Sequence, residues 1–311
     1  MAANLRAARA PRRFAGAGHW WVPYLFVAPF VALFLAFLIV PIVLAFRNSM
    51  FSTRSSGLGF GGPPKAVFSG VDNYVQALQD TDFLASFGRV LLFGVVQVPV
   101  MILVAGAFAL LFDAGMVRAG RFFQTAMFLP YAVPSVIAAL LWGFLYQPAV
   151  SPLLQGLAAV GLDLDVLAPG AVLWAVANIS TWVYTGINMI ILFAALQSIP
   201  REMFEAARLD GAGELRLAVS VKIPMIWPAV LLTVLSSIIG TLQLFNEPLV
   251  LRTLTHNISS TYTPNMSIYT VATQGSSENL SAAMAVILGV ATLVVSVFVM
   301  RLTTRKGVVR G

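Results

Sequence analysis

The sequence contains no cysteine, which excludes a disulfide framework, a thiolate metal site and a cysteine nucleophile. Its two histidines, His19 and His256, are too few and too far apart to indicate a metal centre. They are also poorly placed as bases for a buried nucleophile, so no Ser/His/Asp set is convincing. No GxxxxGK[ST] loop occurs, so the chain is not expected to be an ATPase itself. We therefore expect no catalytic residue, no metal and no cofactor in this chain.

Charged residues are scarce as well, at 10% of the chain, whereas hydrophobic residues reach 59% and the mean hydropathy is +0.87. This composition is far more apolar than that of a soluble globular domain. Long apolar runs predict an all-α polytopic membrane protein with six transmembrane helices. The predicted spans cover residues 24–46, 87–112, 122–146, 170–196, 223–249 and 280–300. They lie in one membrane domain, 21–301, flanked by a tail at 1–20 and a tail at 302–311.

The chain has a net charge of +7, and the distribution of its basic residues indicates how it is oriented in the membrane. Fourteen of the nineteen Lys and Arg residues fall in segments predicted on one side, and such an excess marks the cytoplasmic side. Both termini are therefore predicted to be cytoplasmic, and nucleic-acid binding has no support. The fourteen residues are Arg6, Arg9, Arg12, Arg13, Arg118, Arg121, Arg201, Arg208, Arg216, Lys222, Arg301, Arg305, Lys306 and Arg310.

One segment between two predicted spans is rich in charge, and we call this segment, Leu196–Pro224, the polar loop. Its first part predicts a short helix that Ser198 caps, with Pro200 in the first turn, where no N–H is needed. Gly211 is expected to end that helix with a positive φ. A second amphipathic stretch, Glu214–Val221, leads back toward the membrane.

The predicted helix has an apolar face made of Met203, Phe204 and Ala207. One interpretation is that the helix lies on lipid headgroups with Met203 and Phe204 inserted. The other is that it docks its apolar face in a groove of a soluble partner. Ala206 and Ala207 favour the second interpretation, because small side chains let another backbone approach closely.

The polar loop also carries a long spaced motif: Glu205-Ala206-Ala207, three residues, Gly211, nine residues, then Val221-Lys222-Ile223-Pro224. It resembles the EAA loop of binding-protein-dependent ABC importer permeases, whose pattern is EAA, three residues, Gly, nine residues, Ile-x-Leu-Pro. The departures replace one apolar residue with another. The flanking LQSIP and DGAG resemble the carbohydrate, maltose-permease-like branch of that family.

This resemblance implies the type I ABC importer permease fold, and a permease domain over residues 21–301. It makes residues 198–221 a cytoplasmic coupling loop that contacts a separate ATPase chain. The residues that it implies in this contact are Met203, Phe204, Glu205, Ala206, Ala207, Asp210 and Gly211.

Polar and aromatic residues inside the third, fourth and fifth predicted spans are candidates for a transport pathway. Amide, hydroxyl and aromatic groups suit a neutral, hydroxyl-rich ligand, whereas a phosphate or carboxylate would favour Lys or Arg. Only Arg89 lies near, and we expect it to extend to the membrane interface. The segment Leu129–Ser135 resembles a proline-containing motif of maltose-type permeases in which Tyr and Ser face the sugar. The substrate-pathway residues implied are Tyr131, Ser135, Ser180, Trp182, Tyr184, Gln243, Asn246 and Glu247.

These candidates also have structural interpretations. Tyr131 and Trp182 fit a packed core, and Glu247, near a membrane end, fits a solvated position. The family places asparagines where this chain has Gln243 to Glu247, which leaves the sugar's identity open. Hydroxyls in membrane helices often bond their own backbone carbonyls, and we expect this of Thr233, Ser236 and Ser237.

Two further elements, Tyr24–Pro29 and Val71–Tyr74, resemble the first of the two permeases that such importers usually encode. The resemblance implies ATP-driven import of a sugar or oligosaccharide across a prokaryotic cell membrane. It implies as partners a second permease subunit in a heterodimer, two ATPase subunits that bind ATP and Mg²⁺, and an extracytoplasmic solute-binding protein. Glycerol-phosphate or another polyol derivative is the alternative cargo. A secondary transporter would need an internal repeat and acidic groups in span centres, and neither is evident.

Overall fold

The computed structural model describes residues 21–54, 65–274 and 277–307. The predicted tail at 1–20 lies outside the described residues, as do the last four residues of the chain. The described chain separates into two units, residues 1–45 and 46–311. The first unit holds α1 (Val22–Phe34), a π-helical turn, η1 (Leu35–Ile39), and the first part of α2 (Val40–Ser49), whose last residues belong to the second unit.

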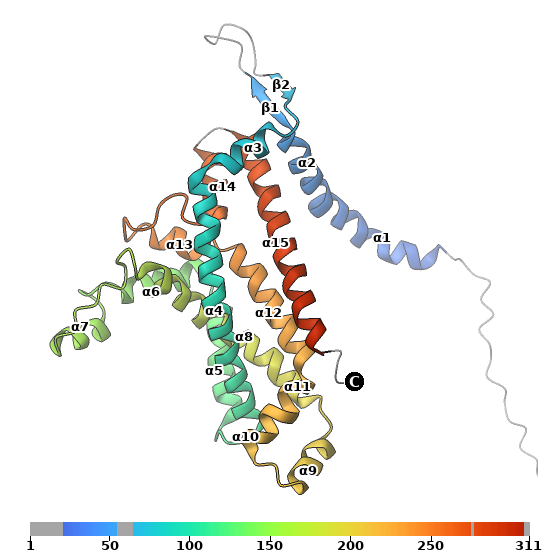
Figure 1. Cartoon of the computed structure of the whole chain (residues 1–311), viewed down its shortest axis with the longest axis vertical. Helices are drawn as coiled ribbons and strands as arrows, with labels where there is room; N and C mark the ends of the chain where they lie inside the picture. The colour runs from blue at the N-terminus through green and yellow to red at the C-terminus, as the bar shows by residue number, and fades with distance from the viewer. Residues whose placement is uncertain (1–20, 55–64, 275–276, 308–311) are drawn as a thin grey trace, which may run out of the picture. The chain divides into compact units, whose positions relative to one another are not determined.

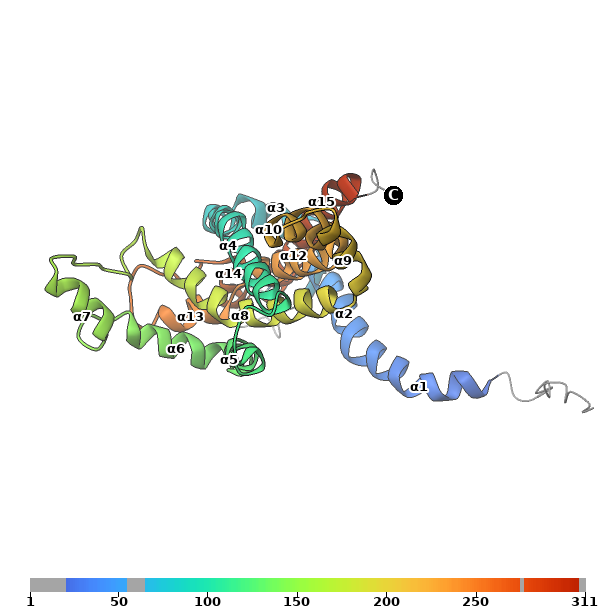
Figure 2. The same ribbon diagram turned by 90° about the horizontal axis from the view of Figure 1, so that it is seen from below.

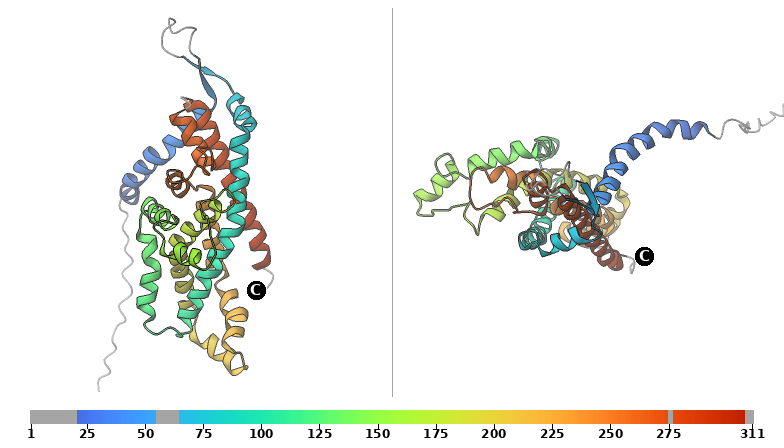
Figure 3. Two further views of the ribbon diagram at one scale, coloured as in Figure 1. Left: turned by 90° about the vertical axis from the view of Figure 1, so that its left-hand side faces the viewer. Right: turned by 90° about the horizontal axis from the view of Figure 1, so that it is seen from above.

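The second unit is mostly helical. Its long helices run nearly vertically in Figure 1, with α3 and two strands at the upper end and α9 and α10 at the lower end. The left-hand view in Figure 3 places these ends in the same way. The helical elements after α2 are α3 (Asp72–Gln79), α4 (Thr81–Asp113), α5 (Gly120–Ala132), α6 (Ser135–Leu145), α7 (Pro152–Ala159), α8 (Val172–Gln197), α9 (Arg201–Leu209), α10 (Glu214–Leu217), η2 (Ala218–Lys222), α11 (Ile223–Met225), α12 (Trp227–Leu242), α13 (Asn246–Leu251), α14 (Pro264–Thr273) and α15 (Glu278–Gly307).

Among the described residues, five helices are long and apolar enough to cross a membrane, and there are six if a bent pair of helices forms one span. The helix α15 continues past residue 300, the predicted end of the last span, to Gly307. The five are Pro23–Ser49, Thr81–Asp113, Val172–Gln197, Trp227–Leu251 and Glu278–Leu302.

The span predicted over residues 122–146, whose two prolines predict a bent helix, is a pair of helices with a sharp break. Here α5 and α6 meet at an angle of 99°, and α6 and α7 extend sideways from the end of α5 in Figures 1 and 2. Val133 and Pro134 are both extended, with ψ of 127° and 133°. A residue that precedes proline avoids the helical region, so the chain breaks at Pro134. Pro130 remains inside α5.

A small hairpin replaces part of the loop that was expected after the first span. The strands β1 (Phe51–Arg54) and β2 (Lys65–Phe68) pair antiparallel. Asn73, in α3, fixes the base of this hairpin by donating its amide to the carbonyls of Ser49 and Phe51, each at 2.8 Å. This gives the Val71–Tyr74 element a structural role at the end of the bundle.

The core of the second unit forms around α8, which packs along α4 and against α5. The approach of α5 to α8 is close enough that a Cβ at Gly186 would collide with the backbone of Met127 and Phe128. Glycine therefore lets two helices meet backbone to backbone, as small residues do in membrane bundles.

Candidate functional site

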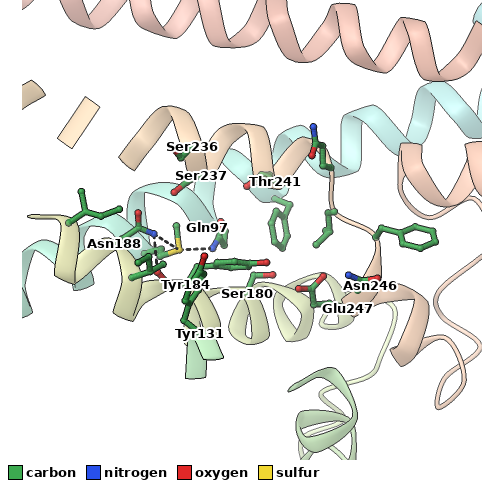
Figure 4. A pocket seen from close by; sticks show the side chains of 18 residues that line it. Gln97, Tyr131, Ser180, Tyr184, Asn188, Ser236, Ser237, Thr241, Asn246 and Glu247 are labelled. Carbon is green, nitrogen blue, oxygen red and sulfur yellow. Dashed lines mark hydrogen bonds between the residues drawn. The ribbon is translucent and has the colours of Figure 1, made fainter. Parts of the chain in front are cut away.

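A cavity of about 380 Å³ opens between α4, α5, α8, α12 and α13 (Figure 4). Its walls combine aromatic rings, amides, hydroxyls and one carboxylate with a smaller number of aliphatic groups. Such a mixture of apolar surface and converging polar groups is typical of a ligand site. Its polar and aromatic residues include Phe93, Gln97, Tyr131, Ser180, Tyr184, Asn188, Ser236, Ser237, Thr241, Gln243, Phe245, Asn246 and Glu247.

One wall of the cavity is an interruption of the fifth span. The helix α12 ends at Leu242, and α13 begins again at Asn246. Because irregular backbone within a membrane must be satisfied by protein or water, such a break is tolerated beside a cavity. Asn265 satisfies part of it by donating its Nδ2 to the Gln243 carbonyl at 2.9 Å.

The structure brings together most of the predicted pathway residues. Ser135 lies behind the wall and accepts a hydrogen bond from Asn246 Nδ2 at 2.9 Å. Trp182 was predicted at the pathway but instead packs on the hydrophobic core, with its ring 5.9 Å from that of Trp142. Six predicted residues line the cavity: Tyr131, Ser180, Tyr184, Gln243, Asn246 and Glu247.

Two tyrosines from different helices form an aromatic surface in the cavity. The rings of Tyr131 and Tyr184 lie 6.2 Å apart between centroids, at an interplanar angle of 64°. Both side chains remain partly exposed, at 43% and 38%. The interpretation of Tyr131 as a core residue is therefore wrong, and both rings can contact a ligand.

Two buried polar groups, the Ser180 hydroxyl and the Glu247 carboxyl group, line this cavity. Within the described part of the chain, the Ser180 hydroxyl has no hydrogen-bond partner. Glu247 is only 4% exposed, so the interpretation of it as a solvated residue is wrong. Buried polar groups are normally hydrogen-bonded. A ligand or water in the cavity would therefore supply the partner that the Ser180 hydroxyl lacks.

The polar loop forms the second candidate site. Gly211 has φ of 81°, as expected, and ends α9. Its N–H donates to the Arg208 carbonyl, and the Ala212 N–H donates to the Ala207 carbonyl, each at 3.0 Å. These two bonds form a Schellman motif. Ser198 does not cap α9, because its hydroxyl donates to the Ala195 carbonyl at the end of α8.

The side chains of α9 divide between the bundle and solvent. Phe204 packs against the core at the ends of α4, α8 and α12, and Ala207 is half-buried. Met203 is 48% exposed, and Leu209 at the end of α9 is 90% exposed. The predicted apolar face is thus split, with Phe204 turned inward. Of the residues predicted to contact an ATPase, those that are exposed are Met203, Glu205, Ala206, Asp210 and Gly211.

These two sites can now be compared with those of known proteins. The family described as "Binding-protein-dependent transport system inner membrane component" matches residues 102–306. The chain belongs to this family. The sn-glycerol-3-phosphate transport system permease protein UgpA of Shigella flexneri is 36% identical over 209 residues, which cover 67% of this chain and 68% of UgpA. UgpA of Salmonella typhi is also 36% identical over 209 residues.

Solved structures agree with the fold of this permease. A chain of a bacterial alginate ABC transporter, in complex with an alginate pentasaccharide-bound periplasmic protein, has a TM-score of 0.77. It is 21% identical, and the match covers 92% of the permease and 95% of that chain. A second alginate ABC transporter structure has a TM-score of 0.74 at 22% identity, covering 92% and 96%. The permease thus has the type I ABC importer permease fold.

Sequence reasoning missed several residues of the permease cavity. Gln97 donates weakly to Thr181 Oγ1 at 3.4 Å, and Asn188 donates to the Tyr184 carbonyl at 2.9 Å. Both amides interrupt apolar runs, and that signal was visible in the sequence. Ser236 and Ser237 also line the cavity. The expected bond to the helix backbone holds for one of the three hydroxyls, since Thr233 donates to the Val230 carbonyl at 2.8 Å.

Arg89 is not at the cavity of the permease and does not simply extend to the interface. Its guanidinium donates to the Tyr262 carbonyl at 2.6 Å and lies 4.9 Å from the centre of the Tyr262 ring. Burial raises the pKa of the Tyr262 phenol, and the Arg89 cation partly offsets that rise. Arg89 thus joins the start of α4 to the segment before α14.

Proposed function

We propose that this permease forms the translocation path for a neutral sugar or oligosaccharide in an ATP-driven importer. The observation that carries the proposal is the chemistry of the cavity. Among residues 21–54, 65–274 and 277–307, no Lys or Arg lines it. Glu247 supplies a buried carboxylate, and a phosphate or uronate beside it would meet charge repulsion without a compensating cation.

The same walls suit sugar hydroxyls. A carboxylate and amides accept and donate hydrogen bonds to adjacent hydroxyl groups, and the faces of Tyr131 and Tyr184 can contact the C–H surface of a pyranose. The unpaired Ser180 hydroxyl adds one more donor and acceptor. A neutral polyhydroxylated ligand therefore fits every polar group of the cavity.

The relatives offer a second candidate cargo. UgpA is named for sn-glycerol 3-phosphate, and the alginate transporters import an acidic polysaccharide. Transport of an anion would require basic groups that a second permease subunit contributes to a shared cavity. The neutral cargo remains the proposal because this chain's own lining is acidic or uncharged.

The partners proposed for this permease are based on its family membership and on the exposed polar loop. The partners are a second permease in a heterodimer, two ATPase subunits that hold ATP and Mg²⁺, and an extracytoplasmic binding protein. Both termini and the polar loop lie in the cytoplasm of a prokaryote. Met203, Glu205, Ala206, Asp210 and Gly211 contact an ATPase subunit, and closure of the ATPases displaces α9. Binding-protein docking and this displacement together shift the permease between outward-open and inward-open states.

The test is ATPase activity of the co-expressed complex in lipid nanodiscs, with candidate binding proteins and sugars. We expect one binding protein with one neutral sugar to raise ATP hydrolysis. Glu205→Ala and Gly211→Pro should abolish that response in complexes that still assemble, because they alter the exposed loop. Stimulation by glycerol 3-phosphate or an acidic oligosaccharide, and not by any neutral sugar, would overturn the cargo. Normal transport by both loop variants would overturn the coupling role.

A further inference from the structure

The described chain contains two ion pairs, and they differ sharply in burial. Arg208 and Glu214 pair at 2.7 Å on the surface, with side chains 54% and 53% exposed. Asp113 and Lys222 pair at 2.6 Å with side chains only 6% and 4% exposed. Asp113 and Lys222 lie more than a hundred residues apart in the sequence. Their burial against each other therefore calls for an explanation.

The pair lies where four elements meet. Asp113 is the last residue of α4, and Lys222 is the last residue of η2, on the return limb of the polar loop. Gln197, the last residue of α8, donates its Nε2 to the second carboxylate oxygen of Asp113 at 2.8 Å. The Lys222 ammonium also lies 5.1 Å from the centre of the Phe204 ring of α9. We call these four residues the loop anchor.

Each contact in the loop anchor depends on the others. A carboxylate at a helix C-terminus is disfavoured by the helix dipole, so Asp113 needs the Lys222 cation. The two carboxylate oxygens are divided between Gln197 and Lys222, which fixes the relative positions of α4, α8 and η2. A buried ion pair is weak evidence for net stability, whereas the loss of one partner leaves an uncompensated charge. Such a pair is better suited to fixing geometry than to adding stability.

We propose that Asp113 and Lys222 are positioning residues that join the polar loop to α4 and α8, so that α9 and these spans move together. This inference rests on the proposed role of α9 as the contact for an ATPase subunit. Phe204 of α9 contacts the Lys222 ammonium, and Gln197 of α8 donates a hydrogen bond to Asp113. Because α4 and α8 both supply cavity residues, displacement of α9 reaches the cavity through the anchor.

The first experiment measures coupling in the assembled complex. Asp113→Asn and Lys222→Met each leave one charge unpaired, and we expect substrate uptake per ATP hydrolysed to fall about tenfold. The exchange D113K/K222D restores the pair with reversed sign and should recover uptake to within about threefold of wild type. Glu214→Gln removes the exposed ion pair of the same loop and should leave the ratio unchanged. All values are normalised to the amount of complex assembled.

The second experiment measures the distance between α9 and α4 directly, independently of transport. The chain has no native cysteine, so spin labels can be attached at Leu209→Cys on α9 and Leu103→Cys on α4. Both sites are exposed, at 90% and 73%. A joined loop gives one narrow distance distribution, which Lys222→Met should broaden and D113K/K222D should narrow again.

The outcomes separate the two proposals. If both single variants keep the narrow distribution and the wild-type uptake per ATP, the anchor is only structural and the inference is overturned. Reduced assembly with an unchanged ratio and an unchanged distribution would overturn it equally. If the wild-type complex shows no ATPase response to any binding protein, the proposed function fails, while the distance distributions still decide whether Asp113 and Lys222 join α9 to α4.

Discussion

At the residue scale, selectivity should depend on the buried Glu247 carboxylate. Glu247→Gln keeps the size of the side chain but replaces one acceptor oxygen with a donor. We expect the apparent KM for a neutral sugar to rise about tenfold, the cost of one unsatisfied buried hydrogen bond. The binding protein's own affinity should not change. Thr233→Val is the control, because Thr233 bonds its own helix behind the cavity, and uptake should stay within about twofold. If the two variants changed the apparent KM equally, Glu247 would not contribute to sugar recognition.

The same scale shows what a sequence can reveal about such a site. A polar group in an apolar run is conspicuous, which is why Gln243, Asn246 and Glu247 were predicted at the pathway. An aromatic side chain in a span looks the same whether it faces a ligand or a core, and for that reason the sequence left both interpretations of Trp182, which packs on the core, open. Asp113 and Lys222 are separated by more than a hundred residues, so their pairing depends on how the ends of α4 and η2 meet.

At the element scale, the backbone contact between α5 and α8 should limit stability. A methyl group at Gly186 would collide with the Met127 carbonyl, which cannot rotate away as a side chain can. We expect Gly186→Ala to destabilise the permease by about 1–3 kcal/mol, as overpacking does. The thermal unfolding midpoint of the purified complex measures this. Gly289→Ala in α15, where nothing lies within 4 Å of the added methyl, is the matched control and should not lower the midpoint. If neither variant changed the midpoint, the close contact between α5 and α8 would not contribute to the stability of the permease.

Some features of the helices and strands could be predicted from the sequence, and others could not. The apolar runs identified the helices, and Gly211 ended α9 with the expected positive φ. The break at Pro134 was expected only as a bend, because a proline in a sequence does not state how far its helix turns. The hairpin of β1 and β2 carried no clear alternating pattern. It depends on Asn73, whose bonds to Ser49 and Phe51 are set by tertiary structure.

At the scale of the whole molecule, the contacts of α4 and α8 decide how often the chain crosses the membrane. The ends of these helices meet, since Gln197 bonds Asp113. Their beginnings also meet, since Arg89 of α4 and Leu173 of α8 line one recess. The two helices therefore run parallel, and the chain between them must return across the bilayer. Only the bent pair α5–α6 lies in that interval with sufficient apolar length among the described residues, so it counts as the sixth span.

Because the chain has no cysteine of its own, single cysteines introduced on either side of α5–α6 can report whether this pair crosses the membrane. Val160, between α7 and α8, is 72% exposed, and Leu215, in the polar loop, is 80% exposed. If α5–α6 crosses the membrane, these positions lie on opposite sides, and the excess of Lys and Arg on the side of the polar loop puts that loop in the cytoplasm. A membrane-impermeant maleimide should then label Val160→Cys in intact cells, and Leu215→Cys only after the membrane is opened. Labelling of both only in opened cells would make α5–α6 a re-entrant loop and the permease a five-span protein. Labelling of Leu215→Cys alone in intact cells would invert the orientation and place the polar loop beyond reach of any ATPase.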